Sequence, residues 1–298
     1  MGRLRKAVIP VGGLGTRFLP ATKSVPKEML PVASKPIVQY AYEEAVEAGI
    51  EECVFITGRH KEAINNHFDH AVELQANLKR LNKHEGLKHV YASIPDKAAV
   101  AYVPQHDPKG LGHAVWCARH LIGDEPFALL LPDEMFLHSP GALKQMADAF
   151  EVHPDACVIA IDEVRPEETS SYGIITPKQG EITDSPRLVP IAAMVEKPRP
   201  EEAPSRLAIT GRYILQPKIF SYLNQLKEGK GGEIQLTDSL QDMVNDCPFY
   251  GFRFEGRRFD CGSRRGFLEA NVAYALERPE TRDSTAEIVK KYYARLYG

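Results

Sequence analysis

A glycine-rich stretch near the N-terminus has the residue types that bind anionic oxygens. It reads Gly-Gly-Leu-Gly-Thr-Arg over residues 12–17 and follows the short apolar run at residues 6–11. Glycines let the backbone approach a ligand closely and let successive N–H groups point at phosphate oxygens. A tight turn without a ligand explains the stretch equally well, because it matches neither Gly-x-Gly-x-x-Gly nor a Walker loop. The residues that would bind phosphate here are Gly12, Gly13, Gly15 and Thr16.

Three basic residues, Arg17, Lys23 and Lys27, follow the glycines. Several prolines in this segment prevent a long helix, so the three cations are expected on a stiff loop beside the glycines. Such a loop can hold cations against phosphates, and a solvated basic surface loop is the alternative. Residues 1–35 contain seven basic residues and one acidic residue, Glu28, so this end of the chain is locally suited to a polyanion.

Two carboxylates stand where apolar strands are predicted to end. Asp133 follows the apolar residues 127–131 after one proline, and Asp260 follows a predicted strand at residues 250–254. Ligands of α/β sheets collect beyond the carboxyl ends of strands, so both carboxylates could face a cleft. Taken alone, an Asp after a strand is more often a turn or cap residue. We expect Glu134, which follows Asp133, to face solvent.

Short apolar segments alternate with helical segments over the first 160 residues. The apolar segments are rich in β-branched residues, which favours strands, and the helical segments end at glycines such as Gly49 and Gly123. This alternation predicts an α/β fold with a Rossmann-like, mixed but mainly parallel sheet flanked by helices. The predicted strands are residues 6–11, 53–57, 101–103, 127–131 and 157–161, and the predicted helices are residues 37–48, 61–68, 112–122 and 142–150.

The rest of the chain is expected to complete the same domain, so that residues 1–298 form one unit. Residues 163–206 carry many Pro, Glu and Ser residues around short strand candidates, and we interpret about 163–215 as an extension on the substrate side. Residues 69–97 are predicted to be an inserted helical excursion. Helices are predicted near the C-terminus, over about residues 263–298.

The composition argues against several classes of protein. The 37 Lys and Arg residues against 40 Asp and Glu give a net charge of −3 over 298 residues, which disfavours a surface that binds nucleic acid throughout. Five cysteines without a Cys-x-x-Cys pair indicate reduced thiols. The N-terminal apolar run is broken at Pro10, too early for a signal peptide or a membrane span. We expect a cytoplasmic protein without nucleic-acid or membrane partners.

The glycine stretch and the basic loop together resemble the signature of the sugar-nucleotide pyrophosphorylases. The resemblance covers about residues 6–275 and implies a nucleotidyltransferase fold of the GT-A-like kind. Its motifs occur in the family's order: Gly-Leu-Gly-Thr-Arg at 13–17, Pro-Ala-Thr-Lys at 20–23, Pro-Lys-Glu-Met-Leu-Pro at 26–31, Lys-Gly-Leu-Gly-His-Ala at 109–114, Leu-Pro-Asp at 131–133, Ser-Tyr-Gly at 171–173, Val-Glu-Lys-Pro at 195–198, Gly-Arg-Tyr at 211–213, Gly-Glu-Ile-Gln-Leu-Thr-Asp at 232–238 and Asp-Cys-Gly at 260–262.

The resemblance implies a reaction in which glucose 1-phosphate attacks the α-phosphorus of UTP, with Mg²⁺ as cofactor and UDP-glucose and pyrophosphate as products. It also implies roles for individual residues. Arg17, Lys27 and Lys197 are the implied catalytic cations, and Asp133 and Asp260 the implied metal ligands. The implied nucleotide-binding residues are Gly12, Gly13, Gly15, Thr16, Glu28, Gln105 and Gly110, of which all but Gly15 and Thr16 would bind the base. The implied residues for the sugar phosphate are Gly173, Glu196, Lys197 and Gly211.

The residues alone leave simpler roles open, since Glu196 and Lys197 could be a surface ion pair and Gln105 an exposed loop amide. A thymidylyltransferase that uses dTTP is the nearest alternative, and Glu28 disfavours it because that family usually has Gln at this position. A non-catalytic regulatory paralogue is the other alternative, and the presence of both Asp133 and Asp260 counts against it. The resemblance also implies a homo-oligomer, a dimer or tetramer, with the late helices as candidate interface.

Overall fold

A mixed nine-stranded sheet forms the centre of the computed structural model, which describes residues 3–298 apart from the side chain of Lys230. The strand order is β5-β4-β1-β6-β11-β8-β12-β10-β9. The bounds of these strands are Lys6–Pro10 (β1), Glu52–Thr57 (β4), Ala99–Pro104 (β5), Phe127–Leu130 (β6), Cys157–Glu163 (β8), Gly173–Pro177 (β9), Leu188–Glu196 (β10), Leu207–Leu215 (β11) and Phe249–Arg253 (β12).

The direction of the strands changes in the middle of the sheet. Strands β5, β4, β1 and β6 are parallel, as the alternation of apolar and helical segments predicts. Strand β11 is antiparallel to both of its neighbours, β6 and β8, while β12 is parallel to β8. Strands β10 and β9 continue the sheet with antiparallel pairing. Residues 163–215, predicted to form an extension, thus supply three strands of the main sheet.

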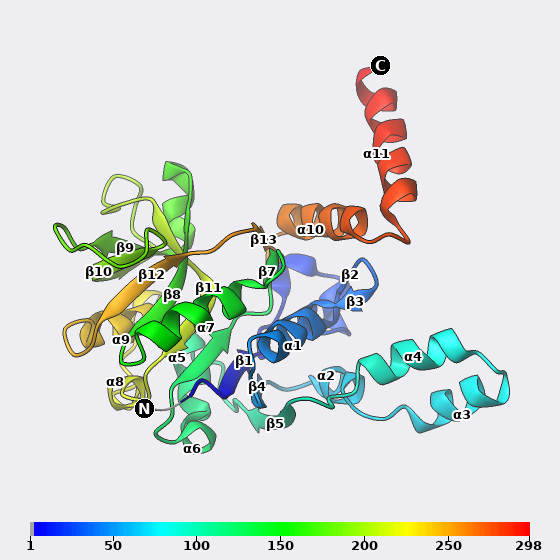
Figure 1. Cartoon of the computed structure of the whole chain (residues 1–298), viewed down its shortest axis with the longest axis horizontal. Coiled ribbons are helices and arrows are strands. Elements are labelled where there is room, and N and C mark those ends of the chain that lie inside the picture. The colour runs from blue at the N-terminus through cyan, green and yellow to red at the C-terminus, as the bar shows by residue number, and fades with distance from the viewer. Residues whose placement is uncertain (1–2) are drawn as a thin grey trace.

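Helices cover both faces of the sheet (Figure 1). Side chains alternate along a strand, so Val8 packs with the helices of one face while Ala7 and Ile9 pack with those of the other. The helices on the Val8 face are α5 (Leu111–Cys117), α6 (Arg119–Ile122), α8 (Ile219–Leu223) and α9 (Leu236–Met243). Those on the opposite face are α1 (Ile37–Glu47), α2 (Glu62–His67) and α7 (Ala142–Val152).

Two short ribbons and a third apolar cluster support the edge where the predicted site residues lie. Strand β7 (Glu134–Leu137) pairs with β13 (Arg257–Asp260), and β2 (Pro31–Val32) pairs with β3 (Lys35–Pro36). Helix α10 (Arg264–Glu277) packs on this cluster, and the Ser263 side chain caps it by accepting from the Gly266 N–H. Asp260 therefore ends a strand of its own, which the sequence analysis did not predict. Short 3₁₀ turns occupy Thr16–Phe18, Ala21–Lys23, Lys27–Met29, Pro166–Ser171 and Lys230–Gly232.

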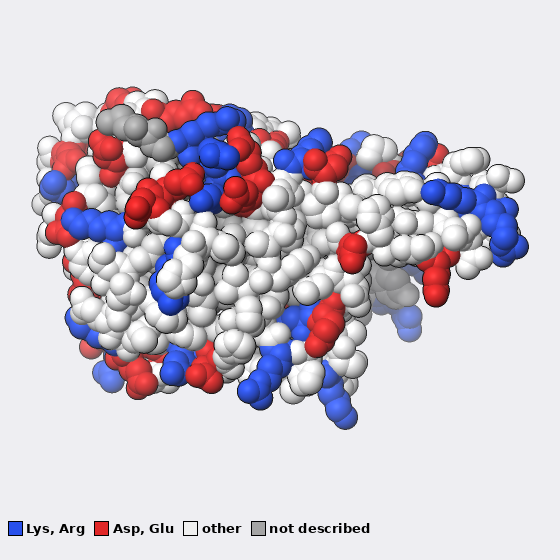
Figure 2. All heavy atoms as spheres, turned by 90° about the horizontal axis from the view of Figure 1, so that it is seen from below, with Lys and Arg blue, Asp and Glu red and all other residues white. Residues whose placement is uncertain are grey.

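Two helical segments extend from the body of the molecule. Helices α3 (Val72–Arg80) and α4 (His84–Ala92) form a hairpin, which is the helical excursion predicted at residues 69–97, and α11 (Arg282–Tyr297) stands beyond α10 (Figure 1). Charges of both signs are interspersed over the face drawn in Figure 2. Over residues 3–298 there is no helix with the length and apolar character needed to span a membrane.

Candidate active site

A cavity of about 610 Å³ opens where the ends of β6, β9, β10 and β13 meet the middle of β11. Short loops at the strand ends carry the polar side chains, and the sheet register brings them to one edge. Segments that are more than 200 residues apart in sequence, such as those of Arg17 and Asp260, meet here. Predicted site residues that line the cavity are Arg17, Asp133, Gly173, Glu196, Lys197, Gly211 and Asp260.

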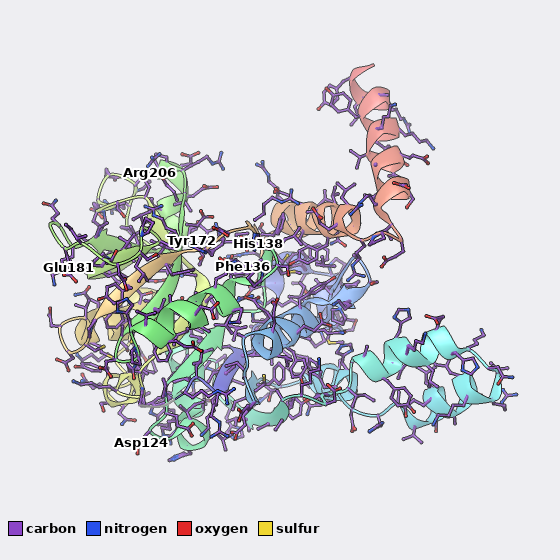
Figure 3. All side chains as sticks on the ribbon, in the orientation of Figure 1. Asp124, Phe136, His138, Tyr172, Glu181 and Arg206 are labelled. Atoms are coloured by element: carbon purple, nitrogen blue, oxygen red, sulfur yellow. The ribbon has the colours of Figure 1, made fainter. Side chains whose placement is uncertain are left out.

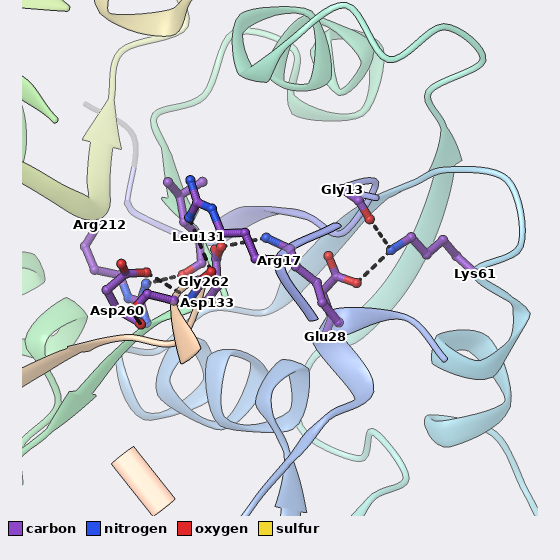
Figure 4. A network of polar contacts seen from close by, with 11 residues as sticks. Gly13, Arg17, Glu28, Lys61, Leu131, Asp133, Arg212, Asp260 and Gly262 are labelled. Atoms are coloured by element: carbon purple, nitrogen blue, oxygen red, sulfur yellow. Dashed lines mark hydrogen bonds and ion pairs between the residues drawn. The ribbon is translucent and has the colours of Figure 1, made fainter. Parts of the chain in front are cut away.

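The two predicted metal ligands face one small space beside Gly262. The position that a Cβ atom on Gly262 would occupy lies 2.9 Å from Asp260 Oδ1, 3.1 Å from Asp133 Oδ2 and 3.4 Å from Arg17 Nη1. The Gly262 N–H donates to Asp260 Oδ1 (2.9 Å), and Arg17 donates to the Gly262 carbonyl (3.3 Å; Figure 4). Carboxylate oxygens are the protein ligands that Mg²⁺ prefers, and Mg²⁺ keeps water and phosphate oxygens for its remaining positions. The pair therefore fits a magnesium ion, although no cluster of three or more His, Cys, Asp or Glu residues with metal-site geometry occurs within residues 3–298.

Lys27 connects the glycine loop with Asp133. Its Nζ atom lies 2.6 Å from Asp133 Oδ2 and 3.5 Å from the Cβ position at Gly13. Burial opposes the charge on Lys27, but Asp133 and Glu28 outweigh this effect and raise the lysine's pKa. Burial likewise works against the Asp133 carboxylate, while the Lys27 charge and hydrogen bond prevail and lower its pKa. Both side chains are thus charged at neutral pH.

Glu134 does not face solvent, contrary to the prediction. Its side chain is 12% exposed and pairs with Arg258 (3.0 Å) because β7 and β13 place the two residues on one ribbon. Burial raises the pKa of Glu134 to about 7, and Arg258 opposes this rise. The guanidinium of Arg258 also lies over the ring of Tyr172, labelled in Figure 3, at 4.9 Å from the ring centroid.

The predicted sugar-side residues converge on the opposite wall of the cavity. Strand pairing places Glu196 beside Gly173, and Thr237 donates to Glu196 Oε2 (2.6 Å). A Cβ atom on Gly173 would lie 3.0 Å from Thr237 Oγ1 and 3.4 Å from Glu196 Oε2, so only glycine leaves this space open. Lys197 pairs with Glu196 (2.9 Å) and has φ +47°, a conformation that residues other than glycine rarely adopt. Such strain is often retained where a side chain must point in one direction.

A second cavity of about 550 Å³ lies on the other side of the glycine loop and is lined by Gly12, Gly13 and Gln105. The amide of Gln105 donates to the Gly110 carbonyl (3.2 Å), and its Oε1 lies 3.2 Å from the Cβ position at Gly12. Gly15 has φ +65°, and its Cβ position lies 3.1 Å from both Lys27 and Thr22. The loop that carries Gly12, Gly13 and Arg17 therefore borders both cavities.

Glu28 lies beneath the glycine loop and does not line this second cavity. Its side chain is 1% exposed and pairs with Lys61 (2.8 Å), which also donates to the Gly13 carbonyl (2.7 Å; Figure 4). Among the residues that the structure describes, none donates to Glu28 Oε1. Burial raises the pKa of Glu28, and the charges of Lys61 and Lys27 oppose this effect.

Residues 6–277 match the nucleotidyl transferase family. The chain belongs to this family. Similar proteins include the UTP–glucose-1-phosphate uridylyltransferase of Bacillus subtilis, strain 168, which is 47% identical over 283 residues and aligns over 95% of each chain. A UDP-glucose pyrophosphorylase solved with UDP-glucose is 42% identical, has a TM-score of 0.83, and aligns over 92% of this chain and all of that one. The UTP-bound enzyme of Acinetobacter baumannii is 37% identical, with a TM-score of 0.87 and coverage of 96% and 98%.

In this nucleotidyl transferase, several residues that the sequence did not single out support the site residues through hydrogen bonds or ion pairs. Lys61 gives no motif signal, because it stands at an ordinary helix start. Arg212 lies inside the Gly-Arg-Tyr motif at 211–213, which does not indicate its contacts, and Arg258 lies two positions before Asp260. Thr237 lies in the Gly-Glu-Ile-Gln-Leu-Thr-Asp motif, so the resemblance could have pointed to it.

Proposed function

We propose that this nucleotidyl transferase forms UDP-glucose and pyrophosphate from UTP and α-D-glucose 1-phosphate. The observation that carries the proposal is the meeting of Arg17, Lys27, Asp133 and Asp260 on the loops between the two cavities. One cavity is bordered by the glycine loop, as a nucleotide requires, and the other by Glu196 and Lys197, as a sugar phosphate requires. The relatives named for UTP and UDP-glucose support the choice of uridine and glucose over dTTP or a regulatory role.

For the proposed reaction, the site must bring two anions together, whereas no proton has to be removed from the nucleophile. A phosphate monoester has its second pKa near ~6, so at pH 7 the sugar phosphate is already anionic and needs no general base. The barrier comes from bringing this anion to the α-phosphorus of a triphosphate and stabilising the pyrophosphate that leaves. We assign Lys197 to the phosphate of the sugar and Arg17 and Lys27 to the triphosphate, so that cations flank the nucleophile and the leaving group.

Asp133 and Asp260 are the proposed ligands of Mg²⁺. When bound, the ion would neutralise phosphate charge during the transfer. Lys27 shares Asp133 with that site, and its ammonium group holds the carboxylate toward the glycine loop at 2.6 Å. The fit can be tested without turnover, because Mn²⁺ bound to the protein loses its free-ion paramagnetic resonance signal. We expect Asp260→Asn to weaken Mn²⁺ binding at least tenfold, and unchanged binding would remove Asp260 from the metal site.

We propose that Gly12, Gly13, Gly15, Thr16, Gln105 and Gly110 contribute to the nucleotide site. Gln105 can donate and accept at once, as recognition of a uracil edge requires, and Gly110 accepts from its amide. A carboxylate at Glu28 could accept from the uracil N3–H only if it reached past Gly13, whose Cβ position is 3.7 Å from Glu28 Oε1. In the observed arrangement Glu28 acts on the cavity through Lys61 and the Gly13 carbonyl.

The deciding experiment is pyrophosphate release from purified protein with glucose 1-phosphate, Mg²⁺ and either UTP or dTTP. We expect release with UTP at least tenfold faster than with dTTP. Faster release with dTTP would reverse the assignment to a thymidylyltransferase. No release with either nucleotide, in protein that unfolds cooperatively on heating, would favour the regulatory alternative.

We also propose that the protein is a homo-oligomer and that α11 takes part in the interface. None of the residues of α11 is buried, and its sequence places large apolar side chains on the surface. Exposed apolar groups on one helix are stabilised when a second copy covers them. Light scattering on Tyr293→Asp/Leu296→Asp should give a smaller assembly than the unaltered chain, and a monomeric unaltered chain would refute the proposal. The exposed apolar residues are Ile288, Val289, Tyr292, Tyr293, Leu296 and Tyr297.

A further inference from the structure

An arginine is fully buried beneath the floor of the larger cavity. Arg212, in the centre of β11, is 1% exposed. Its Nε and Nη2 atoms donate to the two carboxylate oxygens of Glu44 at 3.1 and 2.8 Å. Nη1 donates to the carbonyls of Leu131 (2.8 Å) and Gly211 (3.0 Å), and the guanidinium lies 4.6 Å from the ring centroid of Phe136. One side chain thus joins helix α1 to two backbone segments of the site, and Figure 4 shows Arg212 beside one of them, at Leu131.

The two carbonyls belong to the segments that carry site residues. Leu131 directly follows strand β6 and stands two residues before Asp133, the proposed metal ligand. Gly211 lies where the register of β11 against β8 shifts, with φ +67°, and borders the cavity directly. The Leu131 N–H also donates to the Gly211 carbonyl (2.9 Å). Arg212 therefore fixes the junction from which both the Asp133 loop and the sugar-side bulge begin.

Glu44 determines where the guanidinium lies. It comes from helix α1, and its side chain is 10% exposed. Besides Arg212, its Oε1 accepts from the Leu143 N–H (3.0 Å) at the start of helix α7. Glu44 thus belongs to helix α1 and is hydrogen-bonded to the start of helix α7, and both sets of contacts fix its position. Its two carboxylate oxygens accept from two different nitrogens of the Arg212 guanidinium.

A gain in folding stability does not by itself explain why Arg212 and Glu44 form a buried ion pair. Desolvation of two buried charges offsets most of their attraction, and apolar residues of similar volume often stabilise a protein as well or better. A bidentate arginine does supply direction, because its planar donors can satisfy a carboxylate and two carbonyls in one fixed geometry. Lysine at the same position has no such fork.

We infer that Arg212 and Glu44 are positioning residues of the nucleotidyl transfer, which set the place of Asp133 and of the Gly211 bulge without touching substrate. The inference rests on the proposed function for its kinetic readout. Residues behind metal ligands commonly change metal affinity or activity about 10–100-fold when replaced. We expect an effect of this size on Mn²⁺ affinity and on kcat, with KM for UTP changed less than about threefold.

The test compares Arg212→Lys with Arg187→Lys as matched control. Arg187 also donates to a backbone carbonyl, that of Arg253 (2.9 Å), and lies over the ring of Phe252, but it precedes β10 and lines neither of the two cavities. Mn²⁺ binding is measured on the protein alone by paramagnetic resonance, and kcat and KM by pyrophosphate release. Arg212→Lys should lose at least tenfold in both Mn²⁺ affinity and kcat, whereas Arg187→Lys should lose neither. Equal values for the two variants would overturn the inference.

A double variant separates positioning from folding. Arg212→Met/Glu44→Leu removes both charges, so no buried charge is left unpaired, and we expect its melting temperature to lie above that of Glu44→Leu alone. Mn²⁺ affinity and kcat should stay low despite this recovery, because the guanidinium that joins the carbonyls of Leu131 and Gly211 to helix α1 is gone. Recovery of kcat together with stability would show that the pair acts only in folding. If the unaltered chain released no pyrophosphate, the proposed function would fail, while the Mn²⁺ comparison would still decide the inference.

Discussion

The buried pair of Lys61 and Glu28 offers a quantitative test of how the glycine loop is supported. Lys61→Met removes the ammonium group that lies 2.8 Å from Glu28 Oε2 and 2.7 Å from the Gly13 carbonyl. Glu28 is 1% exposed, which limits the access of water to its carboxylate, and its Oε1 has no donor among the described residues. Removal of one member of a buried pair costs about 3–5 kcal/mol. We expect the lower end of this range, since the charge of Lys27 still acts on Glu28.

The loss in free energy of unfolding caused by Lys61→Met should be larger at high pH than at low pH. Burial already raises the pKa of Glu28, and without Lys61 it rises further. A carboxyl group whose pKa is raised in the folded state contributes most to stability when it is protonated, and this contribution is lost as the pH rises through the folded-state pKa. The variant should therefore be closer to the unaltered chain at pH 5 than at pH 8. Glu28→Gln/Lys61→Met, which leaves no buried charge at this place, should lose less stability than Lys61→Met at pH 8.

Urea unfolding followed by circular dichroism at pH 5 and pH 8 measures these differences. Lys88→Met is the matched control, because Lys88 pairs with Glu85 at 2.8 Å while both side chains are more than 70% exposed. Exposed pairs contribute about 1 kcal/mol or less. A loss below 1 kcal/mol in Lys61→Met at pH 8, equal to that of Lys88→Met, would refute the reasoning.

Other predictions concern a proposed metal ligand, the sheet bulge and a half-buried histidine. Asp133→Asn should lower kcat at least 100-fold while the far-ultraviolet circular dichroism spectrum is retained, and near-normal pyrophosphate release would remove Asp133 from the site. Gly211→Ala should lower the free energy of unfolding by about 1–3 kcal/mol, because φ is +67° and the new Cβ would lie 2.7 Å from two carbons of Glu134; unchanged urea unfolding would contradict this. Burial lowers the pKa of His67 below its ordinary 6.5, so the unfolded chain binds this proton at higher pH than the folded one and stability falls as the pH drops below 6.5. His67→Gln should remove that part of the decline in pH-dependent urea unfolding, and an identical decline would exclude His67 as its source.

Sequence reasoning predicted well what is encoded locally. The parallel half of the sheet follows from short β-branched runs separated by helices, and β4 is observed at Glu52–Thr57 against the prediction of 53–57. The relation of Asp133 to the end of β6 could also be predicted, because one proline separates it from an apolar run. The pattern of residues 112–122 predicts one helix, whereas the structure has α5 and α6 meeting at Ala118.

The direction of strands in the second half could not be predicted from local pattern. Strand β11 is buried along its whole length, like a parallel strand, yet it runs antiparallel between β6 and β8. A continuous apolar run predicts that both faces of a strand are buried, but it does not predict whether the strand is parallel or antiparallel to its neighbours. The same limit applies to β7 and β13, each four residues long, whose pairing brings Arg258 to Glu134 and so buries a carboxylate that the sequence suggested would be solvated.

The ion pairs Glu44–Arg212 and Lys61–Glu28 could not be predicted from the sequence, and the physical reason is the same for both. Glu44 and Arg212 are 168 positions apart, and each stands in a segment whose other residues explain it fully as a helix or a strand. Their contact exists because β11 is inserted beside β6, which carries Arg212 to the Leu131 carbonyl, while α1 covers the same face. Motif residues touch ligands, so their chemistry constrains their type and spacing. Residues that position them are constrained only by the assembled fold. For this reason Lys61 and Glu44 could be found only once the strand order was known, and the Gly-Arg-Tyr motif at 211–213 includes Arg212 without indicating what it contacts.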